Sequence, residues 1–302
     1  KPELLAPGTY SLVNYREAER VVDDYNALAT RAESIMNALP AAKRDAFYEL
    51  VLFPTKASAQ VNELYVEAAK NALYAAQGRA SANTHADRAR ALFQADTDLM
   101  AYFNKRFMNG KWDHFMDQSH IGYTTWRDPP SNTMDAIHLA RVTVPEAAGL
   151  GIAVEGSTDA WPGATGTPAL PAFDALNRQQ SYIDVFDRGQ TPFTFTATPS
   201  APWIVLSDRG GTIGDDTRIT VTVDWAHAPM GDAAGTITIA GAGTSVAVHV
   251  TSRTPADVTR ATLTGFAEGD GYVSIEPEHY TKKTDAGSRR WIRIEDYGRT
   301  LS

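Results

Sequence analysis

The residues best suited to chemistry lie close together in residues 109–129. This stretch holds two histidines, two tryptophans and three aspartates. Histidine with aspartate can ligate a metal ion, and tyrosine or tryptophan rings can stack on the apolar C–H face of a pyranose. The same residues also suit a structural junction, in which aromatic side chains are buried and polar ones bond irregular backbone. Junction, sugar contact and metal site all remain open.

Four side chains from this stretch are the candidate substrate-binding residues: Lys111, His120, Tyr123 and Trp126. A metal site is the weakest of the three interpretations, because histidines six residues apart do not share one face of a helix. We expect Trp112 to be buried at a boundary between domains, and Trp126 to be more exposed and nearer any saccharide.

No catalytic residue is predicted in this chain. Inverting hydrolysis of a glycoside needs two carboxyl groups about 6.5–9.5 Å apart across a pocket. The paired acids in the sequence are Asp23/Asp24, Asp96/Asp98 and Asp215/Asp216, and we expect each to be a solvated charge on a helix face or in a turn. The sequence also lacks a glycine-rich phosphate loop and a nucleophile elbow.

The composition of the chain excludes several kinds of site and argues against several kinds of partner. The chain has 302 residues, a net charge of −8 and no cysteine. The absence of cysteine excludes disulfides, thiolate nucleophiles and cysteine-ligated zinc. An acidic chain without a basic face argues against nucleic-acid partners, and no apolar run reaches the length of a membrane span.

Helical periodicity dominates residues 1–110. Apolar residues recur with the 3.6-residue spacing of amphipathic helices, with a capping-box start at Asn14 and Glu17 and a break or kink at Pro54. We therefore expect an antiparallel helical bundle, followed by a junction at 111–138. One shared core is predicted from residues of common spacing: Val22, Tyr25, Leu28, Leu64, Ala68, Leu92, Leu99 and Phe103.

The period changes from 3.6 to 2 beyond residue 140. Alternating strands separated by turns predict an Ig-like antiparallel β-sandwich over 139–254. Residues 255–302 read as the incomplete beginning of a C-terminal β-sandwich, with strands at 271–276 and 291–294. The fold class is thus multidomain α + β.

Several segments in the first 130 residues resemble glycoside hydrolase family 115, the xylan α-1,2-glucuronidases. Residues 111–126 resemble the hallmark segment of that family. Other segments also resemble the family and occur in the same order as in its members: residues 1–5, 9–12, 14–20, 45–51 and 74–79.

The resemblance implies a long bacterial enzyme that removes glucuronic acid or 4-O-methyl-glucuronic acid from xylan, with its catalytic carboxylates in a (β/α)8 barrel. This chain resembles only the part after the barrel. The implied partners are that barrel, xylan or glucuronoxylan oligosaccharides and a second copy in a homodimer, and the implied location is secreted or periplasmic. The implied role is to brace the barrel and complete a cleft rim. The alternative is a stand-alone carbohydrate-binding or oligomerisation module.

Glu276 and Glu278 form the one candidate metal pair. Their segment is similar to the first strand of carbohydrate-binding jelly-roll modules, where a Glu-x-Glu pair helps to hold a structural calcium. Pro277 departs from the small residue usual between them, and the alternative is a pair of strand-edge acids. No other cofactor is expected.

Overall fold

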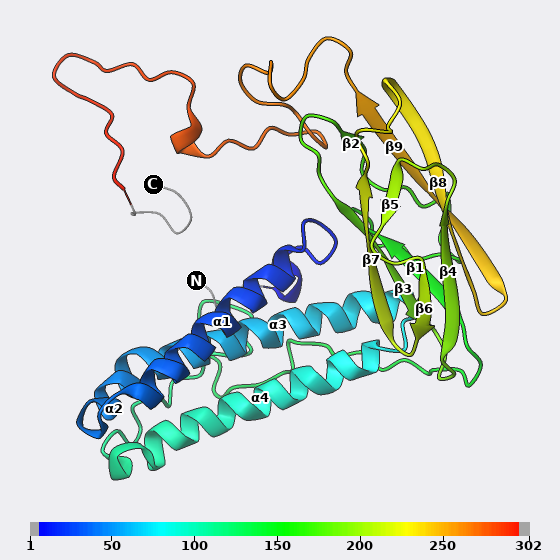
Figure 1. The fold of residues 1–302 in the computed structure, drawn as a ribbon. Helices are drawn as coiled ribbons and strands as arrows, with labels where there is room; N and C mark the ends of the chain where they lie inside the picture. Colours follow the sequence, from blue (N-terminus) through cyan, green and yellow to red (C-terminus); the bar gives the residue numbers. More distant parts are fainter. Residues whose placement is uncertain (1–5, 296–302) are drawn as a thin grey trace.

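The computed structural model describes residues 6–295. A helical region is followed by two β-sheets, which confirms the α + β composition expected from the change of period (Figure 1). None of the helices in this described part is long and apolar enough to cross a membrane.

Three long helices build the first region. α3 (Phe53–Gln77) packs against both α1 (Glu17–Ala38) and α4 (Ala82–Lys105), so that the three lie side by side in Figure 1. The short helix α2 (Ala41–Phe47) leads into a π-helical turn, η3 (Tyr48–Leu52), directly before α3. Pro54 lies in the first turn of α3, where the missing backbone N–H of proline costs little. The break predicted at Pro54 is therefore found just before it, as the π-helical turn η3. Two 3-10 turns complete the region, η2 (Pro7–Thr9) and η4 (Phe107–Gly110).

The start of α1 differs from the predicted capping box. No side chain caps the helix at Arg16, the residue before Glu17. Instead, Glu17 accepts a hydrogen bond from the backbone N–H of Ser11 at 2.7 Å, and the Ser11 hydroxyl accepts one from the N–H of Asn14 at 3.0 Å. Ser11 therefore takes the reciprocal role that the sequence assigned to Asn14.

The helical region has two hydrophobic clusters, and the prediction of one shared core is wrong. The first gathers Tyr48, Phe53, Phe103 and Phe107, with Leu99 packed against it. The second includes Leu64, Ala68 and Leu92. Leu28 belongs to neither and is 54% exposed on α1. Helical spacing identifies a face of α1 but not whether another element covers it.

The segment after α4 turns back along the helices. Ile121 and Ile137 are buried in the second cluster, with Leu64 and Leu92. Trp112 is half-buried and packs on the first cluster, whose buried members come from α1, η3, α3, α4 and η4 and not from the sheets, so its predicted place at the domain boundary is wrong. Trp126 is 67% exposed, and the expected difference between the two tryptophans is confirmed.

Two sheets follow. The first has the antiparallel order β1-β3-β7-β5, and the second has the order β2-β9-β8-β4-β6, with β2 parallel to β9. The strands are β1 (Leu150–Val154), β2 (Phe173–Asp174), β3 (Ser181–Asp187), β4 (Phe193–Pro199), β5 (Ile204–Leu206), β6 (Gly210–Ile213), β7 (Asp216–Val223), β8 (Gly231–Gly241) and β9 (Thr244–Thr254).

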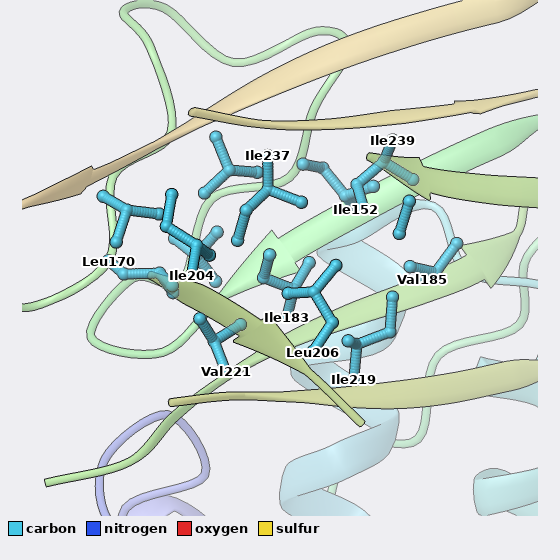
Figure 2. Packing of buried hydrophobic residues seen from close by; sticks show 14 of the residues in the cluster. Ile152, Leu170, Ile183, Val185, Ile204, Leu206, Ile219, Val221, Ile237 and Ile239 are labelled. Carbon is cyan, nitrogen blue, oxygen red and sulfur yellow. The ribbon is translucent and has the colours of Figure 1, made fainter. Parts of the chain in front are cut away.

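One hydrophobic core lies between the sheets. Figure 2 shows Ile237 and Ile239 of β8 facing Ile183 of β3 and Ile219 of β7. The predicted alternation is confirmed in β7, whose apolar residues are buried while their neighbours are more accessible. The turn Ala242–Gly243 between β8 and β9 has positive φ at both residues, as a tight hairpin requires.

Strand β3 is buried on both faces. Ile183 and Val185 face the core, while Asp184 and Phe186 lie on the opposite face, towards the helical region. Gly151 of β1 pairs with Phe186, and a Cβ at Gly151 would lie 2.1 Å from the Phe186 ring. Only glycine leaves room for that ring.

No strand follows β9 in the part of the chain that the structure describes. The predicted strands at 271–276 and 291–294 are wrong, because neither segment has a continuous strand to pair with. The region instead contains isolated bridges and a short 3-10 turn, η5 (Pro277–His279). Pro277 lacks the N–H that pairing would use.

Candidate functional site

A groove of about 620 Å³ lies in the helical region and is lined by α1, α3, α4, residues 115–123 and the segment around η2. We call it the aromatic groove. Its aromatic lining comes from four segments that are distant in the sequence. These side chains are Tyr10, Tyr25, Phe53, Tyr65, Phe115 and Tyr123.

His120 forms part of this groove and is bound to a buried partner. Its Nε2 lies 2.9 Å and 3.0 Å from the two carboxylate oxygens of Asp96, which is 1% exposed on α4. Its Nδ1 lies 3.1 Å from the carbonyl oxygen of Gln118. The hydrogen bond to Asp96 raises the pKa of His120, and burial opposes that shift more weakly. Both ring nitrogens are thus used within the protein, so His120 positions its segment and has no nitrogen left for a substrate.

The backbone around His120 is held by neighbouring polar groups. Asn132 Oδ1 accepts the backbone N–H of His120 at 2.7 Å and that of Ile121 at 3.0 Å. The Tyr123 hydroxyl lies 2.5 Å from Oδ1 of Asp128. These bonds fix an irregular segment against α4 and present the Tyr123 ring to the groove.

The four predicted substrate-binding residues do not converge. His120 and Tyr123 line the aromatic groove, whereas Lys111 and Trp126 are not part of its lining. Lys111 places its ammonium 4.6 Å from the Trp112 ring. Proximity in the sequence grouped the four residues, but the irregular segment between them points them in different directions.

The predicted metal pair is not part of a larger ligand set in the described chain. Glu278 lies 3.4 Å from Arg293 and 3.7 Å from His279, so cations of the protein already neighbour it. Among residues 6–295 no group of three or more histidine, aspartate or glutamate side chains is arranged to hold a metal ion.

A second, polar hollow of about 760 Å³ lies where the helices meet the first sheet. Arg218 bonds Asp184 at 2.7 Å and Glu19 at 2.8 Å, and the Ser81 hydroxyl donates to Asp216 at 2.6 Å. Burial raises the pKa of Asp216, against the opposing effect of Arg79. These contacts link α1 and the start of α4 to β3 and β7.

Sequence reasoning missed the burial of Asp96, which is 1% exposed, and the distant partner of Asp216, whose side chain stays 26% exposed. Asp96 lies under the His120 segment, and Asp216 lies at the edge where β7 meets the α3–α4 turn. A signal was present for Asp96, which shares a helical face with Leu92, Phe103 and other buried residues. Asp216 carries no comparable signal, because its partner Ser81 is 135 residues away.

Comparison with known proteins identifies one part of the chain. Residues 265–302 match the Glycosyl hydrolase family 115 C-terminal domain. The predicted resemblance to that family is confirmed at these residues, a segment other than those on which the prediction was based.

Solved structures resemble parts of the chain. A Bacteroides ovatus GH5 xyloglucanase in complex with a XXXG heptasaccharide is 18% identical with a TM-score of 0.24, over 34% of this chain and 19% of its own. The ASH / PapD-like domain of human CEP192 is 12% identical with a TM-score of 0.27, over 40% of this chain and 96% of its own. This chain thus spans about a fifth of the xyloglucanase. No curated protein sequence matches it.

Proposed function

We propose that this chain is the non-catalytic C-terminal portion of a xylan α-1,2-glucuronidase, whose catalytic barrel it braces. The observation that carries the proposal is the family 115 segment together with its attachment to the rest of the chain. The Tyr15 hydroxyl, at the start of α1, donates to Asp270 at 3.0 Å, and the Asn177 amide donates to the carbonyl oxygen of Glu268 at 3.2 Å. The family segment is therefore tied to both the helices and the sheets.

The distribution of carboxylates supports a non-catalytic role. Among residues 6–295, no aspartate or glutamate lines the aromatic groove. In the polar hollow, Asp184 is bonded to Arg79 and Arg218, and Asp216 to Ser81. A general acid and a general base need free access to a glycosidic oxygen and a water molecule. These carboxylates are engaged in holding the helices on the sheet.

Exposed apolar side chains support the bracing role. Leu28 and Ile35 lie seven residues apart on α1 and are 54% and 42% exposed, and Leu50 in η3 is 73% exposed. Such side chains are often covered by a partner surface. We assign that surface to the barrel, or to a second copy in a homodimer.

The proposal has three further parts. The two sheets form an Ig-like sandwich, and the parent enzyme is secreted or periplasmic. Calcium is the one proposed ion, held by Glu276 and Glu278.

Uronic acid release tests the proposal. The 302-residue chain alone should release none from 4-O-methyl-glucurono-xylooligosaccharide, and a barrel-containing remainder should gain activity when the chain is added. Leu28→Asp should weaken that gain, whereas Met230→Asp, equally exposed between β7 and β8, should not. Release by the chain alone, abolished by one carboxylate substitution within it, would overturn the non-catalytic assignment.

A further inference from the structure

The aromatic groove has the chemistry of a ligand site rather than of a packing defect. Its volume of about 620 Å³ lies within the ordinary range of small-molecule sites. Its walls come from separate parts of the chain, with Tyr10 beside η2, Tyr25 on α1 and Phe115 after η4. Phe115 is 60% exposed although it also stacks near Phe103, with ring centroids 6.3 Å apart. An aromatic ring is thus held at the rim with most of its surface in water.

The part of the groove lining that the structure describes contains no lysine, arginine, aspartate or glutamate. His120 is the one lining residue that titrates near neutral pH, and its charge is matched by the buried carboxylate of Asp96. Because both His120 nitrogens are already bonded, a ligand carboxylate would find no free cation there. The groove therefore suits an uncharged ligand.

The groove also offers unused hydroxyl groups. Those of Tyr10, Tyr25 and Ser58 make no hydrogen bond to any residue in the described chain. Each can both donate and accept a hydrogen bond. A purely apolar ligand would leave these groups unpaired on binding, at a cost in free energy. A ligand with apolar faces and many hydroxyls would satisfy them.

We propose that the aromatic groove binds an uncharged oligosaccharide of pyranose rings, with Phe115 and Tyr25 contacting the apolar sugar faces. The ligand class comes from the groove itself, whereas the choice of xylan as its source rests on the proposed function. This site binds the undecorated backbone of the polymer, since it has no free cation for a uronate. It holds the chain near the polymer.

Calorimetric titration of the 302-residue chain with xylohexaose tests the site. Ser58 is exposed on α3 and lines the groove, so Ser58→Trp should fill it and lower the affinity at least about tenfold. Ser34→Trp, at an exposed serine of α1 outside the groove lining, is the matched control and should stay within about twofold. Circular dichroism of each variant confirms folding.

A second variant keeps the test valid if Ser58→Trp fails to fold. Phe115→Ala should lower the affinity about threefold to tenfold, as expected for loss of one stacking ring. Leu50→Ala, an exposed apolar residue outside the groove, should leave it unchanged. Xylohexaose binding that neither groove variant weakens would overturn the proposal, as would binding of an apolar dye with no binding of any hexaose.

Two further ligands separate the site from the proposed function. A glucuronic-acid-decorated xylohexaose should bind no more tightly than the undecorated one, and a clear gain would overturn the neutral-ligand assignment. Binding of cellohexaose in place of xylohexaose, lost in Ser58→Trp, would support the sugar site and contradict the xylan assignment.

Discussion

Arg79 and Asp184 form an ion pair across the boundary between the helices and the first sheet. Nη2 of Arg79, in the turn after α3, lies 3.3 Å from Oδ2 of Asp184 on β3. The Arg79 side chain is 2% exposed, and its guanidinium also lies over the Tyr74 ring at 3.9 Å and the Phe186 ring at 4.3 Å. One side chain therefore couples the α3–α4 turn to the outer face of β3.

Removing Arg79 should strongly destabilise the chain. Arg79→Met leaves the buried carboxylate of Asp184 with one partner fewer, and we expect the free energy of unfolding to fall by about 3–5 kcal/mol. Arg90→Met removes an exposed ion pair with Asp87 and should change the free energy of unfolding by less than about 1 kcal/mol. Urea denaturation measures both, and equal small effects would contradict a structural role for Arg79.

The His120–Asp96 pair should make stability depend on pH. The folded-state pKa of His120 is raised, so its contribution is complete below the unfolded value near 6.5 and is lost as the pH rises through the folded value. The stability difference between the native chain and His120→Gln should therefore shrink from about pH 6 to about pH 9. A constant difference for His120→Gln would refute the pair's role.

Phe103 and Leu28, both predicted for one helical core, should differ in how much each contributes to the stability of the chain. Phe103 is fully buried among Tyr48, Phe53 and Phe107, and Phe103→Ala should cost about 3–5 kcal/mol. Leu28→Ala should stay within about 0.5 kcal/mol, because Leu28 is exposed. Thermal and urea unfolding check both values. A large loss at Leu28 in the isolated chain would restore the single-core prediction.

Gly151 should tolerate no larger residue while Phe186 is present. A Cβ there would lie 2.1 Å from the Phe186 ring, and we expect Gly151→Ala to cost about 1–3 kcal/mol. Phe186→Leu removes the clashing ring atoms, so the double variant should lose less than the sum of the two single variants. Strict additivity in a double-mutant cycle would show that this contact does not set the cost.

The sequence alone predicted the α + β order and the alternation of several strands, among them β7. These features depend on local periodicity, since a helix or strand must present its apolar residues at 3.6 or 2 residue intervals to bury them. It also singled out the stretch that holds His120 and Tyr123, which line the aromatic groove, because this stretch is dense in polar and aromatic side chains. The aromatic groove as a whole could not be predicted, since Tyr10, Tyr25 and Phe115 meet only after the chain turns back along α3 and α4.

Tertiary structure alone decided which charged and apolar residues are buried. Asp96 looks like a surface acid in sequence, but His120 arrives from a distant segment to cover and bond it, whereas Asp216 stays accessible and gains Ser81 as a partner. Leu28 matches its predicted core partners in spacing, yet no element covers its face of α1. Strands predicted after residue 255 are absent from the described chain, because pairing needs a neighbouring strand as well as alternation. Local pattern fixes how a residue is oriented on its own element, whereas burial depends on what packs against that element.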